Sequence, residues 1–283
     1  MQPDAYRSRY ADLAALPNDV LEGHWIRCGR AEGRIGNGIV SRQDFVRLAL
    51  LRSSLDNILE IGPFCNPVLP GAVTCDVLST EALRARAARV GQDPTAVVDV
   101  DYVVDPVEGI KGIGRLFDAV VSSHVLEHQP DLVAHLRSVR AALRSDGLYF
   151  LLVPDSRYCF DHFLPPSSVA QVVAAHHEGR LVHTLQSVIE HRALTTHNDA
   201  TRHWAGDHGD VEIGQVHRVR QAMREYASSG GSYIDVHAWQ FTPSSFGHIM
   251  PSLFELFEVG FSILRIYETH RDSNEFRAIL QAV

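Results

Sequence analysis

The chain has 283 residues, of which 45% are hydrophobic and 21% are charged, and its formal net charge is -8. These values are typical of compact globular proteins and exclude wholesale disorder; the length allows one large α/β domain with an elaboration, or two small domains. Lys111 is the only lysine. Nucleic acid is therefore disfavoured as a partner, because phosphate binding needs clustered cations.

The sequence also indicates where the protein resides. No apolar run approaches the roughly 18 residues of a membrane span. Residues 1–16 carry acidic and basic groups where a signal peptide would be apolar. The four cysteines have neither paired nor disulfide-framework spacing, which is typical of a reducing compartment. We expect a cytoplasmic protein with no membrane partner.

Residues 1–56 read as a helical N-terminal extension. Apolar residues recur at helical spacing in "YRSRYADLAAL" (6–16) and "SRQDFVRLALLRSS" (41–54), where Ser41 is a candidate N-cap. The stretch "GRAEGRIGNG" (29–38) between them is expected to be a loop.

From residue 57 the pattern changes to short apolar runs that alternate with amphipathic stretches, which indicates βαβ units around a parallel sheet. The expected strands are "NILEIG" (57–62), "AVTCDV" (72–77), "DYVVD" (101–105), "FDAVVSS" (117–123) and "LYFLLVP" (148–154). The last of these is apolar throughout and should be central. Helices are expected over 79–91, capped by Ser79 and ended by Gly91, and over 130–147, closed by Gly147.

The remainder divides into an insertion and a return to the sheet. Residues 156–233 are polar and histidine-rich, since nine of the 16 histidines lie between Arg157 and His217, and we expect a partly helical insertion over one end of the sheet. Residues 234–283 predict a helix interrupted by Pro251, followed by the strands "FSILRIYE" and "EFRAILQAV". The short turn between these strands makes them antiparallel.

Acidic and polar residues follow the expected strands at the edge where an open α/β sheet binds ligands, namely Glu60, Asp76, Asp105 and residues 122–128. The first loop lacks the G-x-G-x-x-G pattern that a dinucleotide requires: bulkier side chains fill it and two prolines stiffen it. NAD is thus disfavoured. S-adenosylmethionine has no phosphate, and its ammonium and ribose hydroxyls suit carboxylates.

Five segments carry a family resemblance: "ILEIGPFCNP", "TCDV", "FDAVVSSHVLEHQPDLVAHLRSVRAALRSDGLYFLLVPD", "HAWQFTPSSF" and "SNEFRAIL". Together they resemble the S-adenosylmethionine-dependent methyltransferases of the Rossmann-like class, and within it the bacterial methyltransferase-domain proteins with an "SHVLEH" segment. The resemblance covers residues 56–163 and 234–282. It implies an α/β, Rossmann-like methyltransferase fold: a mostly parallel seven-stranded sheet with an antiparallel C-terminal strand and a helical insertion after the fifth strand. The cofactor-binding core would be 57–155, the lid 156–233, and the C-terminal part of the core 234–283.

The resemblance also implies cofactor-binding residues in the first loop and strand. Gly62 would let the loop pass close to the methionine part of the cofactor, where a Cβ would collide. Glu60 would orient this loop and accept from the ammonium, unless it is only a buried carboxylate that holds loop amides. Pro63 belongs to the same loop, which departs from the common pattern because Pro63 and Asn66 stand where many members have glycine.

Further cofactor contacts are implied at the next strand ends. Asp76 would hold the ribose hydroxyls by charge-assisted hydrogen bonds. Asp105 would meet the adenine amino group, with Asp101 as the less favoured substitute. Both Asp76 and Asp105 have the alternative of being turn acids. Ser123 and His124 would lie beside the methionine and the transferable methyl group.

Methyl transfer to a hydroxyl benefits from a general base, and histidine is the usual choice near neutral pH. We expect His124 and His162 to be the catalytic residues; the alternatives are packing on the cofactor wall and a loop hydrogen bond. His128 is expected to cap or pack, whereas His237 either faces the acceptor or is structural.

No metal is assigned. A zinc, iron or manganese site at His203, Asp207 and His208 is an alternative to a solvated or substrate-lining lid.

The function expected is methylation of a small molecule or glycan with S-adenosylmethionine, at a hydroxyl. No "NPPY"-like motif follows the fourth strand, which argues against methylation of nucleic-acid bases or glutamine. The sugar acceptor is suggested by the resemblance alone. Alternatives are a natural-product N- or O-methyltransferase, metal-assisted transfer, and a non-catalytic cofactor-binding scaffold. The sequence leaves a homodimer open.

Overall fold

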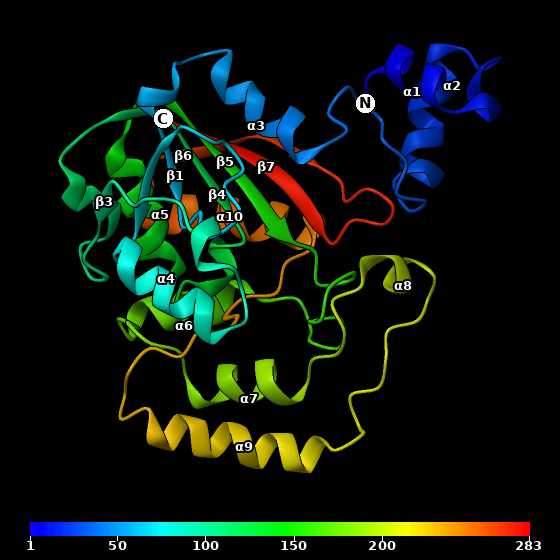
Figure 1. The fold of residues 1–283 in the computed structure, drawn as a ribbon. Coiled ribbons are helices and arrows are strands. Elements are labelled where there is room, and N and C mark those ends of the chain that lie inside the picture. The colour runs from blue at the N-terminus through cyan, green and yellow to red at the C-terminus, as the bar shows by residue number, and fades with distance from the viewer.

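A computed structural model describes residues 1–283, which form a seven-stranded sheet flanked by helices (Figure 1). The strands are β1 Ile58–Ile61, β2 Val73–Asp76, β3 Tyr102–Val103, β4 Phe117–Ser123, β5 Leu143–Pro154, β6 Phe261–Tyr267 and β7 Glu275–Ala282. Their order in the sheet is β3-β2-β1-β4-β5-β7-β6. The seven strands predicted from the sequence are thus all present.

The pairing of the strands defines the fold. The strands from β1 to β5 are mutually parallel, and β7 runs antiparallel to both of its neighbours, β5 and β6. This confirms the Rossmann-like methyltransferase arrangement. The strand order reverses between β1 and β4, and such a switch point is where open α/β sheets bind ligands.

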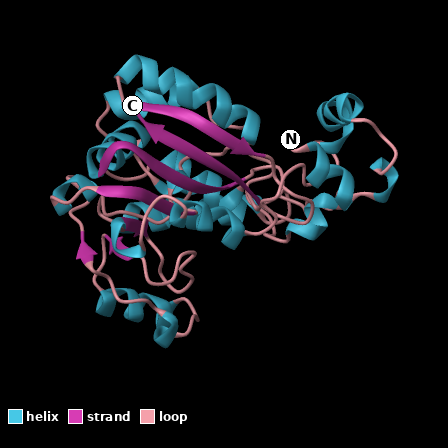
Figure 2. Cartoon of the chain, turned by 90° about the horizontal axis from the view of Figure 1, so that it is seen from above, coloured by secondary structure: helices cyan, strands magenta, loops and turns pink.

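Ten α-helices surround the sheet or extend from it (Figure 2). They are α1 Pro3–Arg9, α2 Asn18–His24, α3 Arg42–Leu50, α4 Thr80–Arg89, α5 Leu132–Ala142, α6 Val169–His177, α7 Leu185–Ala193, α8 Ala200–Trp204, α9 Gln215–Ser228 and α10 Pro243–Phe257. Both views place α1 and α2 away from the sheet, while α7 and α9 lie side by side. None of the helices combines the length and apolarity needed to cross a bilayer.

Two apolar clusters cover opposite faces of the sheet, as alternation along β5 shows. Tyr149, Leu151 and Val153 belong to the larger cluster, which includes residues of α5 and α10. Phe150 and Leu152 belong to the smaller one, which includes residues of α3. Because β5 is buried on both faces, its run of apolar residues has no polar interruption. The prediction that this strand is central is confirmed.

The helix starts follow local capping. Ser41 and Asp44 form a reciprocal capping box at α3, since each side chain accepts from the other's backbone amide. Ser79 caps α4 by accepting from Ala82 N, and Gly91 follows the helix with φ of +77°. Pro251 lies inside α10 without ending it. The roles of Ser41, Ser79 and Gly91 were predicted correctly. The interruption expected at Pro251 is not observed, because α10 runs without a break from Pro243 to Phe257.

One predicted boundary is wrong. The helix expected over 130–147 ends at Ala142, and β5 already begins at Leu143, so Gly147 does not close a helix. The reason is tertiary: Leu143 is buried and pairs with Phe117, after which the register shifts by several residues. Burial of this leucine against the sheet outweighs the helical propensity of the segment.

The insertion after β5 contains α6 to α9, as predicted for residues 156–233. The helices expected before residue 57 are also present, but they are not all peripheral: Phe45, Val46 and Ala49 of α3 are buried in the smaller cluster. α3 thereby belongs to the layer of helices that packs on the sheet.

Candidate active site

A cavity of about 1010 Å³ opens at the carboxyl ends of β1 and β4. Its wall is formed by three parts of the chain: the loop from Glu60 to Asn66, the pair Ser123 and His124, and residues 272–275 before and at the start of β7. Arg42 and Arg277 complete the polar side. Carboxylates and cations therefore face one space at the switch point of the sheet.

Glu60 holds the first loop in place. Its side chain is 1% exposed, and its two oxygens accept hydrogen bonds from the backbone amides of Val68 at 2.7 Å and Leu69 at 3.0 Å. Burial raises the pKa of Glu60 despite these two bonds. Glu60 therefore orients the first loop, as expected both for a cofactor-binding residue and for a carboxylate that only holds loop amides. Its contact with a cofactor ammonium stays a prediction.

Gly62 has φ of +63°, a conformation that favours glycine. A Cβ built at this position would lie 3.3 Å from Val125 Cγ2 and 4.0 Å from Asp76 Oδ2. Pro63, which follows, is buried. The backbone of the loop is therefore fixed close to the ends of β2 and β4.

The two acids predicted to bind the nucleoside differ in their surroundings. Asp76 ends β2, accepts from Leu78 N through Oδ1 at 2.9 Å and turns Oδ2 toward Gly62; burial raises its pKa. Asp105 is exposed, and hydrogen bonds from the Glu108 and Val107 amides lower its pKa. Asp105 is thus used in a turn, and neither acid is part of the cavity wall described above.

Asp101, the substitute for Asp105, is also engaged. Its Oδ2 accepts from the backbone amide of Thr74 at 2.8 Å and from the hydroxyl of the same residue at 3.1 Å. It links the approach to β3 with β2.

His124 stands at the turn that leaves β4. Its φ is +54°, which is rare for a residue with a side chain, and its Nε2 lies 3.0 Å from Glu275 Oε2. Arg42 Nε lies 3.0 Å from the other oxygen of Glu275. Arg42 also donates to the hydroxyl of Ser123. His124 is thereby oriented by a carboxylate that an arginine holds in turn.

Sequence reasoning missed Arg42 and Glu275 as site residues. Burial opposes the charge on Glu275, but the hydrogen bond with His124 and the charge of Arg42 outweigh it, so that the pKa of Glu275 is lowered. The segment "SNEFRAIL" was recognised only as part of the resemblance and as a strand. A signal was available, because an acid at the first position of a buried strand is unusual.

Behind His124 lies a buried cluster of acids and histidines. Glu127 is 1% exposed, and neither of its carboxylate oxygens has a hydrogen-bond partner. His124 Nδ1 lies 3.7 Å from Glu127 Oε1, and His128 Nε2 and His237 Nε2 each lie 3.8 Å from the same oxygen. Glu127 was not singled out from the sequence, although the other members were.

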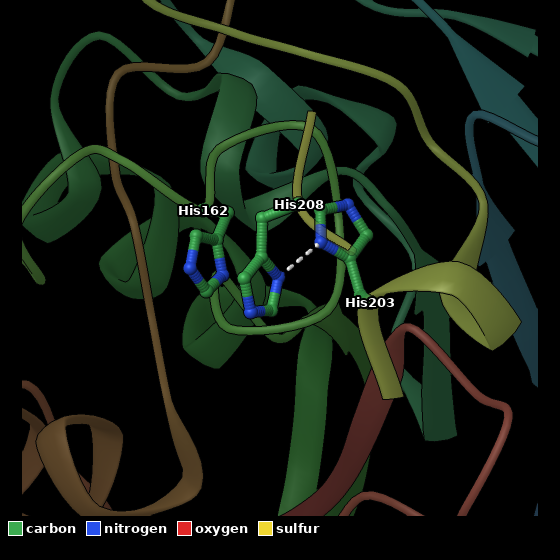
Figure 3. A group of neighbouring side chains, drawn as sticks. All are labelled: His162, His203 and His208. Atoms are coloured by element: carbon green, nitrogen blue, oxygen red, sulfur yellow. Dashed lines mark hydrogen bonds between the residues drawn. The ribbon is translucent and has the colours of Figure 1, made fainter. Parts of the chain in front are cut away.

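The remaining histidines of interest gather in the insertion (Figure 3). His162 and His208 are stacked with ring centroids 3.5 Å apart, and His203 Nδ1 lies 3.0 Å from His208 Nδ1. Asp207 is instead paired with Arg202 at 2.8 Å. The structure therefore joins His203 and His208 as expected but adds His162 in place of Asp207. His162 does not line the large cavity, and its catalytic role stays a prediction.

Comparisons with known proteins agree with this architecture. A family model described as "Methyltransferase domain" matches residues 42–226. A ubiquinone biosynthesis O-methyltransferase of Methylobacterium sp. (strain 4-46) is 30% identical over 131 residues, which cover 40% of this chain and 53% of that protein. A second protein so named, from Methylobacterium nodulans, is 32% identical over 87 residues, which cover 26% of this chain and 35% of its own length. The chain thus spans about half or less of the length of these curated relatives.

The solved structures that match this chain include an S-adenosylmethionine-dependent methyltransferase from Clostridium acetobutylicum. It is 9% identical, with a TM-score of 0.44, and the match covers 93% of this chain and 98% of that one. The family model spans more than half of the chain, from the start of α3 into α9, and so includes the loop of Gly62 and the turn of His124. The chain belongs to the methyltransferase domain family, a family of S-adenosylmethionine-dependent enzymes.

Proposed function

We propose that this chain transfers the methyl group of S-adenosylmethionine to a hydroxyl oxygen of a small molecule or glycan. The observation that carries the proposal is the histidine–carboxylate pair, His124 and Glu275, on the wall of the cavity at the switch point. A histidine with one ring nitrogen bonded to a carboxylate is suited to remove a proton from an acceptor with its other ring nitrogen. The names of the two curated relatives, both O-methyltransferases, also favour oxygen.

The cofactor would lie along the carboxyl edge of the sheet. Gly62 and Pro63 would border its methionine part together with Ser123, and Glu60 would fix the loop. Asp76 Oδ2, which makes no hydrogen bond within the protein, would accept from the ribose hydroxyls. Asp105 would have to give up part of its turn to reach the adenine amino group. A contact with adenine would therefore cost the turn its hydrogen bonds from the Val107 and Glu108 amides.

The reaction would be a single displacement. A lone pair of the acceptor oxygen attacks the methyl carbon, and the carbon–sulfur bond breaks with its electron pair left on sulfur, which yields S-adenosylhomocysteine. The hydroxyl proton passes to His124 Nδ1, since Nε2 already faces Glu275. The main contribution of the protein is to hold oxygen, carbon and sulfur in line.

We further propose that the protein belongs to the bacterial methyltransferases that carry the "SHVLEH" segment. In it, residues 156–233 would form a lid over the side of the cavity where the acceptor binds. This segment is tied to the pocket rim, because Trp204 of α8 donates to the carbonyl of Ser273 at 2.9 Å. Polar side chains on the lid suit a hydroxyl-bearing acceptor.

The test is incubation of the purified protein with S-adenosylmethionine carrying a labelled methyl group and panels of phenolic and sugar acceptors. Label in a product, together with S-adenosylhomocysteine, is expected. Calorimetry with the cofactor alone separates the alternatives: binding without turnover on any panel would favour the scaffold. Absence of binding at millimolar cofactor would refute the proposal entirely.

A further inference from the structure

Glu127 presents an electrostatic problem that the proposed function leaves unsolved. An ionised carboxylate without hydrogen bonds is costly to bury, and polar groups in protein interiors are nearly always paired. Glu127 is 1% exposed, yet Oε1 and Oε2 have no hydrogen-bond partner. The nearest cationic candidates are ring nitrogens at 3.7 to 3.8 Å, beyond hydrogen-bonding range.

Two of these histidines are held from behind by carboxylates. His237 Nδ1 lies 2.6 Å from Asp161 Oδ2, and His128 Nδ1 lies 3.0 Å from Asp235 Oδ1. Each carboxylate favours a proton on the nearby Nδ1, although only His237 forms a hydrogen bond there, because His128 Nδ1 faces Asp235 without hydrogen-bond geometry. The Nε2 lone pair of each ring is then left to point toward Glu127.

Histidines that bind metals almost always have this arrangement, in which the nitrogen opposite the metal donates to a carboxylate or carbonyl. The three inner atoms, His128 Nε2, His237 Nε2 and a Glu127 oxygen, lie within 4.8 Å of one another. Ligands on a tetrahedral ion with bonds of about 2.0–2.2 Å lie about 3.3–3.6 Å apart, and the two Nε2–Oε1 distances of 3.8 Å are close to that range. Small rotations would bring all three onto one ion.

We propose that Glu127, His128 and His237 bind one divalent transition metal ion. Two imidazoles and one carboxylate suit zinc, iron or manganese, and a set of three protein ligands leaves a position open. The ion would supply the partner that the buried carboxyl group of Glu127 lacks. The next step rests on the proposed function. The open position would take the acceptor oxygen, and binding to the ion would lower the pKa of the acceptor hydroxyl. His124, whose Nδ1 lies beside Glu127, would receive the proton.

The histidine cluster in the insertion is the weaker candidate, and it provides a control. Ring nitrogens of His162, His203 and His208 lie within 4.8 Å of one another, but the rings of His162 and His208 are stacked 7° from parallel (Figure 3), so the in-plane lone pairs of these two rings do not converge on one ion. His203 and His208 also satisfy each other by direct contact. No unpaired charge is buried there.

The experiment is calorimetric titration of the chelator-treated full chain with Zn²⁺ at pH 7.5, without cofactor or acceptor. Wild type and His208→Gln should each bind one ion tightly. Glu127→Gln keeps the shape of the side chain and the backbone carbonyl that accepts from Ala238, but it should bind at least ~100-fold more weakly, and so should His237→Gln. Circular dichroism checks that each variant is folded.

Replacing Zn²⁺ with Co²⁺ adds a signature that does not depend on activity: the visible absorption of the bound ion should be absent in Glu127→Gln and retained in His208→Gln. Equal Zn²⁺ affinity in wild type and Glu127→Gln would overturn the proposal. Loss of binding in His208→Gln alone would overturn it too, because it would move the ion to the insertion.

The same material separates this proposal from the proposed function. One bound ion in a protein that methylates no acceptor would support the site and contradict the transferase. Full turnover in the chelated protein would overturn the role of the ion in holding the acceptor.

Discussion

His124 has an unfavourable backbone conformation where the proposed chemistry takes place. A non-glycine residue in a sparsely populated region of φ and ψ costs about 1–3 kcal/mol, and such residues cluster at functional sites. Here the φ of +54° turns the chain sharply after β4, and the ring lies between Glu275 and Glu127. The strain therefore accompanies a side chain that contacts carboxylates on two sides.

Replacement of His124 by alanine is expected to lower turnover by ~10²- to 10⁴-fold, the usual contribution of a general base. The affinity for S-adenosylmethionine should change little, because the proposed function assigns most of the cofactor contacts to the loop of Gly62 and to Asp76. Single-turnover kinetics and calorimetry measure the two effects. Equal losses in both would make His124 a binding residue.

Glu275→Gln tests the positioning of His124. The amide keeps the shape of the side chain but loses the charge that steadies the ring, so turnover should fall less than in His124→Ala. The affinity for S-adenosylmethionine should stay unchanged, because Glu275 acts through the ring of His124. A loss of cofactor affinity as large as the loss of turnover would argue against this positioning role.

Asp76→Ala should weaken S-adenosylmethionine binding by ~10- to 100-fold, since a charge-assisted hydrogen bond contributes about 1.5–3 kcal/mol. Asp101→Asn is the matched control: its carboxylate is used by Thr74, so the change should affect stability and not cofactor affinity. Calorimetry on both proteins decides. Unchanged affinity in Asp76→Ala would show that the ribose lies elsewhere.

At the residue scale, the sequence predicted which side chains gather at the ends of the parallel strands. Gly62, Asp76 and His124 lie near one another because parallel strands end at one edge. Glu275 was missed because 151 residues separate it from His124 and no local pattern connects the two. Glu127 was missed because its environment is made by His237, on a distant segment.

At the level of elements, capping determines where α3 begins. Ser41→Ala removes one half of the capping box and should lower the free energy of unfolding by about 1 kcal/mol. Ser41→Thr keeps the hydroxyl and should cost much less. Urea denaturation of both variants measures the difference, and an equal loss would assign the effect to packing of the side chain.

Elements with local signals were predicted well. Polar caps identified the starts of α3 and α4, and the apolar run of residues 148–154 identified β5 as central. The boundary at Ala142 and Leu143 could not be predicted, because it depends on pairing with Phe117 in a neighbouring strand. Local propensity cannot report such a contact.

For the whole molecule, buried neutral histidines make the fold sensitive to acid. Burial lowers the pKa of His135, His183 and His270 to about 4 each. Between pH 4 and the ordinary value near 6.5, the unfolded chain binds more protons than the folded one. Stability should therefore fall as the pH drops from about 6.5 toward 4.

Urea denaturation at pH 7.5, 6.5 and 5.5 measures this dependence. Neither ring nitrogen of His183 has a partner, so His183→Phe should unfold with a shallower loss of stability on acidification than wild type. Constant or rising stability over this range would contradict the prediction.

The global arrangement was predictable only in part. Periodicity and turn length gave five parallel strands and an antiparallel pair, but placing the strands in a sheet required the family resemblance. The path of the insertion, in which α7 packs on α9, left no signal in a polar and histidine-rich segment. Side-chain contacts made between helices of similar composition are not encoded by spacing alone.

The position of β7 in the chain means that the proposed active site is completed late in translation. Glu275 opens the seventh strand along the chain, yet that strand lies between β5 and β6 and borders the cavity. A polypeptide still emerging from the ribosome can fold its first five strands but lacks the carboxylate that steadies His124. Nascent chains stalled before β7 should therefore remain inert, however much of their sheet has already formed.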